Sequence, residues 1–216
     1  MSFCVSHRLC RQWCAAPILL VAFFLLHLQS PADDQPLQLL LNRFDQVEFM
    51  EYNWRGVDDL SATVTLRLDL NGDLLMVGGV ADDNPLIQPY DNPVMPNWWK
   101  ITYGGDGVTL KITDRTDLKN SAEVALNFGA EGFNPRLMVL KKAPGALGDL
   151  GKAPVLAERQ PRGYLFIARV PLPALLTNTS NRTLSSYTFR LTLHDYDGDE
   201  RSYCRMSIAA NAVPQM

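Results

Sequence analysis

Residues 59–83 read DLSATVTLRLDLNGDLLMVGGVADD, and this stretch decides the fold that we expect. Over 60–70 apolar residues alternate with polar ones, which is the pattern of a strand with one buried face. Asn71 and Gly72 follow at once, and this dipeptide favours a two-residue type I′ turn, in which both central residues have positive φ. Residues 74–80 then form the returning strand. The stretch therefore predicts an antiparallel hairpin.

Further segments along the chain have the composition of short strands. They are 107–113, 123–128, 136–142, 163–170, 187–194 and 203–209. Residues 37–50 carry leucines and aromatics at a spacing that fits either a helix or a strand. Many short strands with turn residues between them and few helix caps predict an all-β fold. We expect an antiparallel β-sandwich of jelly-roll or immunoglobulin-like architecture.

The first 32 residues have the features of a secretory signal peptide. Arg8 and Arg11 precede the apolar run 14–28, and 30–32 reads SPA, a small-x-small cleavage site. The alternative is an uncleaved membrane anchor, but the apolar run is shorter than the roughly 20 residues that a spanning helix needs. We expect export to the periplasm or outside the cell, with no membrane contact after cleavage.

The rest of the chain divides into a leading segment, 33–53, and one domain, 54–213. The full chain has 20 basic and 23 acidic residues and a net charge of −3. Loss of the two arginines of the signal segment leaves 18 basic residues and a net charge of −5. A mildly acidic domain without a basic run lacks the electrostatics of nucleic-acid binding. The same balance disfavours binding to a membrane surface.

Cysteine and histidine are scarce beyond the signal segment. Cys204 is the single cysteine there, so the domain forms no internal disulfide, and we expect a buried small apolar residue. A nucleophilic thiol would need a histidine, and His194 is the single one in the same part of the chain. We expect no thiol enzyme.

Two tryptophans indicate a ligand surface. Residues 84–97 are rich in proline, which predicts a long surface loop, and Trp98 and Trp99 follow it. Indole rings stack on the apolar faces of sugars, so these two residues and Tyr90 are candidate ligand contacts. The alternative is that one tryptophan fills the core. Neighbouring residues of an extended segment point to opposite sides, so we expect one exposed and one buried ring. Trp54 is expected in the core.

Five aspartates lie near predicted strand ends and suggest calcium. Asp195, Asp197 and Asp199 alternate along the chain, while Asp82 and Asp83 end another strand. Ca²⁺ takes several oxygen ligands, and carboxylates converging from neighbouring strands supply them. The alternative is a solvated acidic turn.

A glycosidase needs two carboxyl groups facing each other across a cleft. Asp106 and Asp195 are available by count, but nothing in the sequence sets their environments apart. We therefore predict no catalytic residues and a domain that is not an enzyme.

Four stretches in order resemble a known family. They are 59–83, GGDGVTLKI at 104–112, RGYLFIARVPLPALL at 162–176 and FRLTLHDYDGDERS at 189–202. Over about residues 54–210 the chain resembles a family 9 carbohydrate-binding module, within the wider group of carbohydrate-binding-like β-sandwiches. The resemblance implies sugar binding at one end of the sandwich, structural calcium, and association with glycoside hydrolases or sensor proteins.

The chain departs from this family at its C-terminal end. The family's sugar site uses two facing tryptophans, one of them after the acidic strand end, whereas here no aromatic residue follows Tyr203. Our first hypothesis is an exported, non-catalytic domain that recognises a saccharide through its loop tryptophans and is stabilised by calcium. The alternative is a periplasmic accessory or sensory domain that has lost the sugar site. Such a domain would bind a protein partner, such as a glycoside hydrolase or a membrane sensor.

Overall fold

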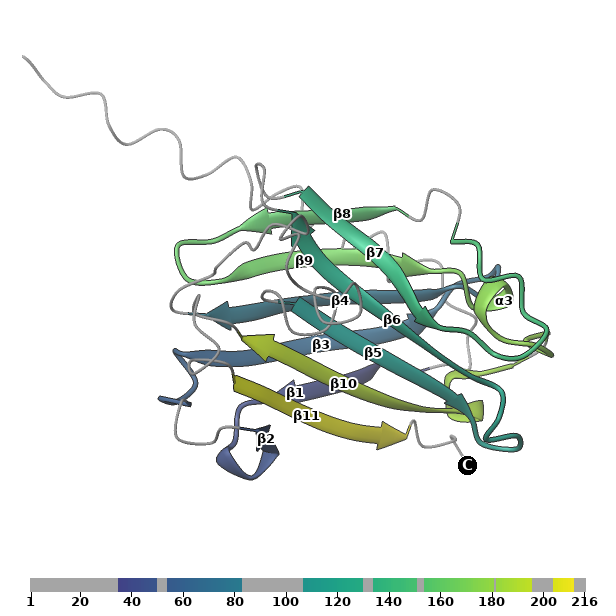
Figure 1. Ribbon diagram of the computed structural model, residues 1–216, viewed down its shortest axis with the longest axis horizontal. Coiled ribbons are helices and arrows are strands. Elements are labelled where there is room, and N and C mark those ends of the chain that lie inside the picture. The colour runs from purple at the N-terminus through teal and green to yellow at the C-terminus, as the bar shows by residue number, and fades with distance from the viewer. Residues whose placement is uncertain are drawn as a thin grey trace, which may run out of the picture.

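The computed structural model describes residues 35–49, 54–82, 107–129, 134–150, 154–180, 182–195 and 204–211. Their strands form two antiparallel sheets that pack face to face (Figure 1). The predicted all-β sandwich is confirmed. The signal segment lies outside the described residues.

One sheet has five strands and the other has six. The five-stranded sheet has the order β1 (Leu37–Leu41), β3 (Leu60–Leu68), β4 (Leu74–Asp82), β9 (Tyr164–Val170) and β8 (Val155–Arg159). The six-stranded sheet has the order β2 (Val47–Phe49), β11 (Cys204–Asn211), β10 (Tyr187–Asp195), β5 (Gly107–Asp114), β6 (Ser121–Gly129) and β7 (Asn134–Lys141). The helices among the described residues are short and lie in the connections between strands: η1 (Phe44–Gln46), α3 (Leu172–Leu175) and η3 (Leu184–Ser186).

The core lies between the two sheets and follows from the alternation in the strands. In β3 and β9 every second residue is buried, because successive side chains point to opposite faces. The largest fully buried rings come from β9 and β10: Tyr164, Phe166, Tyr187 and Phe189. Burying such a side chain stabilises the fold by about 1.5–3 kcal/mol. The packing of these alternating faces holds the sandwich together without a disulfide among the described residues.

The two residues expected in the core take that position. Cys204 is fully buried at the start of β11. Trp54 is partly buried and packs against the core, and its Nε1 donates a hydrogen bond of 2.9 Å to the carbonyl of Leu60. Both predictions are confirmed.

The β3–β4 hairpin exists as predicted, but its turn is of another type. Gly72 has a φ of 78°, whereas Asn71 is not among the described residues with positive φ. The N–H of Gly72 donates to the carbonyl of Asp69 at 3.0 Å, and the N–H of Asp69 donates to the carbonyl of Asp73 at 2.9 Å. The Asp69 carboxylate also accepts the N–H groups of Asn71 and Asp73, which favours this wider turn. The type I′ prediction is therefore wrong.

Candidate functional site

The strands that flank the predicted ligand residues in the sequence meet at one end of the sandwich. β4 and β10 both run to the left side of the molecule in Figure 1, and β5 and β11 begin there. The register agrees, because His194 pairs with Gly107 and Asp195 pairs with Cys204. We call this end the β4–β10 end. Segments 83–106 and 196–203 join these strands, so each of them leaves and re-enters the sandwich at this end.

Two of the five candidate calcium ligands are described, and both are buried at the β4–β10 end. Asp82 closes β4 with 1% of its surface exposed, and Asp195 closes β10 with 3% exposed. Each is in phase with the inward-facing residues of its strand, so their carboxylates turn between the sheets from opposite sides. Asp83, Asp197 and Asp199 lie outside the described residues. Within the described part of the chain no three acidic, histidine or cysteine side chains gather as a metal site.

The candidate sugar contacts cannot be placed in the same way. Tyr90, Trp98 and Trp99 lie outside the described residues, as does Asp106. The position of Asp195 does bear on the glycosidase alternative, because its side chain is buried on the inner face. A glycosidase carboxyl group must instead reach a substrate in an open cleft.

His194 is buried on the outer face of the six-stranded sheet. Its Nε2 lies 3.2 Å from the Thr109 hydroxyl on the neighbouring strand β5. Burial, together with the positive charge of Arg205, lowers the pKa of His194 to about 3. Cys204 faces the opposite side of the sheet, because it pairs with Asp195 while His194 pairs with Arg205. The thiol and the imidazole therefore do not form a catalytic pair.

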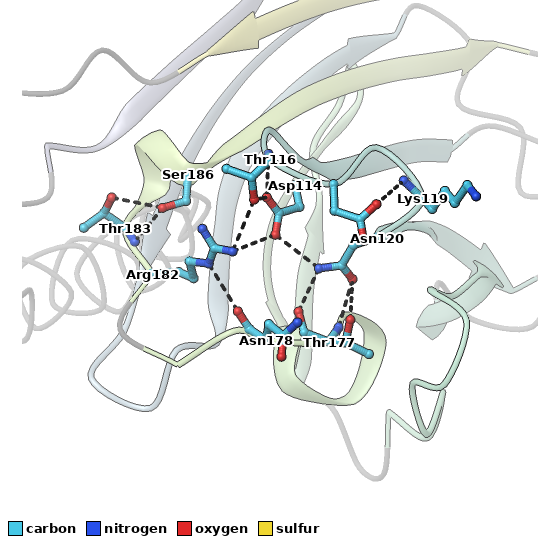
Figure 2. A network of polar contacts seen from close by, with 10 residues as sticks. Asp114, Thr116, Lys119, Asn120, Thr177, Asn178, Arg182, Thr183 and Ser186 are labelled. Carbon is cyan, nitrogen blue, oxygen red and sulfur yellow. Dashed lines mark hydrogen bonds and ion pairs between the residues drawn. The ribbon is translucent and has the colours of Figure 1, made fainter.

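A polar network occupies the opposite end of the sandwich (Figure 2). Asp114, the last residue of β5, accepts hydrogen bonds from the backbone N–H and the hydroxyl of Thr116, at 2.8 and 2.7 Å. Its other oxygen accepts Asn120 Nδ2 at 3.2 Å and Arg182 Nη2 at 3.0 Å. Asn120 in turn bonds the backbone of Thr177, donating at 2.7 Å and accepting at 2.9 Å. The network ties the β5–β6 connection to the β9–β10 connection.

The charge of Asp114 is stabilised within this network. Burial raises the pKa of this carboxyl, but the hydrogen bonds from Thr116 and Asn120 and the charge of Arg182 outweigh burial and hold it below its usual value. The side chains of Asp114, Asn120 and Arg182 bond to other residues of the network, so its role is to stabilise the fold. Sequence reasoning missed it, although Asp114-x-Thr116 is a common pattern for a side chain that bonds the backbone two residues on.

Two aspartates and an arginine join the β3–β4 hairpin to β9. Arg169 on β9 forms ion pairs with Asp69 and, at 3.0 Å, with Asp73. Burial and the neighbouring Asp69 raise the pKa of Asp73, and Arg169 partly offsets this. Arg169 therefore takes the place that a cation would hold between these two carboxylates.

A groove of about 480 Å³ runs over the outer face of the five-stranded sheet. Leu40 and Val57, which are 46% and 48% exposed, form apolar walls, and Thr63 and Gly79 belong to the floor. Gly79 keeps the floor low, because a Cβ there would lie 2.9 Å from the Leu165 side chain. Its one aromatic lining residue, Tyr164, is buried. The described lining thus mixes aliphatic side chains with polar ones such as Gln160 and Arg162, and it offers no exposed ring.

Comparison with protein-family models and with curated proteins finds no match for this chain. In the described part of the chain no helix has the length and apolar character needed to cross a membrane.

Proposed function

We propose that this chain is an exported, non-catalytic domain that binds a saccharide at its β4–β10 end. The observation that carries the proposal is that β4, β5, β10 and β11 all border this end. Trp98 and Trp99 lie in the segment between β4 and β5, and Asp197 and Asp199 lie in the segment between β10 and β11. Both segments therefore begin and end at a common edge of the fold, and sandwiches commonly carry their binding loops at such an edge.

Calcium is part of this proposal. Asp82 and Asp195 come from opposite sheets and turn inward at the same end, and both segments that carry the other three candidate ligands begin directly after them. A cation held there would fix the two segments relative to each other. Ca²⁺ takes carboxylate oxygens as ligands, and inward-facing carboxylates at the same end are candidates to supply them.

The test is retention of the protein on insoluble polysaccharide. Trp98→Ala or Trp99→Ala should lose at least about tenfold in affinity, because stacking on an indole provides much of the grip on a sugar ring. Leu118→Ala is the matched control, since Leu118 is 75% exposed in the β5–β6 turn at the opposite end. If both tryptophan variants are retained as well as the control, Trp98 and Trp99 do not contact the saccharide, and this part of the proposal is refuted.

The second candidate function is recognition of a protein partner through the groove on the five-stranded sheet. Half-exposed leucine and valine side chains beside polar groups such as Arg162 suit a peptide better than a sugar ring. Thr63→Arg would fill the floor of this groove without entering the core, because Thr63 is exposed. A partner that co-purifies with the unmodified domain and is lost with Thr63→Arg, while polysaccharide retention is unchanged, would establish this alternative.

A further inference from the structure

A shallow pocket of about 210 Å³ lies on the outer face of the six-stranded sheet, across β5, β10 and β11. The register places its residues in two adjacent rows. Arg190 on β10 is flanked by Lys111 on β5 and Ala209 on β11. Thr188, two residues earlier, is flanked by Thr113 and Asn211. This pocket, which we call the Lys111–Arg190 pocket, lies where β10 begins, away from the β4–β10 end.

The depression follows from the sizes of these side chains. Lys111 and Arg190 are long and exposed, and they form one wall. Ala209 and the two threonines are short, so the sheet surface beside that wall stays low. Because strands fix the spacing of neighbouring side chains, the shape is set by the backbone register.

All polar side chains that line the pocket are hydrogen-bond donors, and none is a carboxylate. Lys111 contributes an ammonium, Arg190 a guanidinium, Thr113 and Thr188 hydroxyls, and Asn211 an amide. Together they present the ammonium of Lys111, the guanidinium of Arg190, which is ion-paired with Glu48 through one nitrogen, and several neutral donors over a small area. This is the chemistry that recognises an oxyanion.

The two cations are incompletely neutralised. Arg190 uses Nη2 to contact Glu48 and Ser207. Lys111 faces Glu123 across β5 and β6, yet no ion pair joins them within the described residues. Like charges directly opposite each other on neighbouring strands destabilise a sheet, and Lys111 and Arg190 are such a pair. An anion bound between them would relieve that repulsion.

We propose that the Lys111–Arg190 pocket binds the carboxylate or sulfate group of an acidic saccharide. Its volume suits a single acidic group with part of one sugar ring, and the hydroxyls and the amide serve the polar atoms around it. The recognition of an oxyanion stands on the pocket itself, whereas the saccharide as its carrier rests on the proposed function. The pocket would be a second subsite, away from the β4–β10 end.

The experiment is an NMR titration of the ¹⁵N-labelled domain with glucuronate, glucose and inorganic sulfate. Glucuronate should move the amide signals of 111–113, 188–190 and 209–211, and glucose should leave them in place. Lys111→Met should weaken glucuronate binding about tenfold, because it removes one charge-assisted contact. Added salt should weaken binding as well, since the pocket is open to solvent.

Lys141→Met is the matched control, because Lys141 is an exposed lysine on β7 of the same sheet and does not line the pocket. The pocket assignment is overturned if glucuronate moves none of these signals, or if Lys111→Met and Lys141→Met weaken binding equally. If inorganic sulfate binds as strongly as glucuronate, the pocket recognises a simple anion, and the assignment of an acidic saccharide as its ligand is overturned.

The proposed anion pocket and the proposed function can each fail without the other. A domain that binds a neutral polysaccharide through its tryptophans but ignores glucuronate would retain the proposed function and lose this pocket. A domain that binds glucuronate here, with no effect of Trp98→Ala or Trp99→Ala on polysaccharide retention, would do the reverse.

Discussion

His194 shows at the scale of one residue how burial sets pH dependence. Its folded-state pKa is about 3, against about 6.5 for an exposed histidine, because burial and Arg205 both disfavour the charged form. Protonation therefore favours the unfolded chain. The stabilising contribution is complete above about pH 6.5 and is lost as the pH falls toward 3.

We predict that the free energy of unfolding falls by up to about 1.4 kcal/mol per pH unit as the pH drops below 6. His194→Gln should flatten this slope between pH 6.5 and 5, where carboxylates contribute little. Urea unfolding at half-unit pH steps measures both proteins. The same slope in the variant would show that burial of His194 is not its cause.

Asp114 gives a pH dependence of the same sign but at lower pH, because its folded-state pKa lies below the usual value near 3.8. The carboxylate stabilises the fold above that value, and its contribution is lost as the pH falls through the lower folded-state pKa. Asp114→Asn at pH 7 should cost about 2 kcal/mol or more, since Arg182 and the donors of Thr116 and Asn120 lose their charged acceptor.

Asp117→Asn is the control for this substitution, because Asp117 is exposed in the same turn and should change stability by less than about 0.5 kcal/mol. Urea unfolding at pH 7 compares the two variants. Equal losses would mean that the network of Figure 2 adds nothing specific.

At the scale of the elements, strands were predictable where one face is buried and the other is not. β3 alternates fully, so its sequence predicts it within two residues of its observed end. The sequence of β1 fits both a helix and a strand. Leu40 is apolar but points outward, so the buried Leu39 and Leu41 do not stand out as alternating with polar residues. β8 was missed for a similar reason: Leu156 is 68% exposed, and the strand has no fully buried residue.

Among the described glycines, Gly163 has the least space for a side chain. It precedes β9 with a φ of 99°, and a Cβ there would lie 1.9 Å from the carbonyl oxygen of Val80. Gly163→Ala should therefore cost more than Gly72→Ala, which has a similar φ of 78° but open space around its Cβ. We expect about 1–2 kcal/mol for Gly72→Ala from strain alone, and several kcal/mol for Gly163→Ala.

Chemical denaturation of these two alanine variants separates the two effects. Losses of equal size would indicate that the approach of Val80 relaxes freely, and that only the positive φ matters at both turns.

At the scale of the whole molecule, the sequence predicted the sandwich but not how its polar residues divide between the two ends. The alternating strands determine the two layers, whereas the Asp114 network depends on contacts between residues up to 68 positions apart. Such contacts arise only when the sheets close, so no local pattern reports them. The inward burial of Asp82 and Asp195 is likewise a result of strand register rather than of spacing.

The proposed calcium site involves the whole β4–β10 end. If calcium binds the folded chain alone, saturation at 100 times its Kd should add about 2.7 kcal/mol to the free energy of unfolding. Asp195→Asn should lose this gain, and Asp117→Asn, at the opposite end, should keep it. Thermal unfolding in calcium and in chelator measures the difference. An unchanged melting temperature in the unmodified protein would remove calcium from the proposed function.

The most direct measurement of saccharide binding at the β4–β10 end is an NMR titration with a soluble oligosaccharide of the polysaccharide that retains the domain. The amide signals of Asp82, Gly107, Asp195 and Cys204 should move, because these residues border the segments that carry the candidate contacts. The signals of Asp114 and Thr177 at the opposite end should stay in place. Shifts confined to that opposite end or to the groove on the five-stranded sheet, or no shifts at all, would contradict saccharide binding at the β4–β10 end.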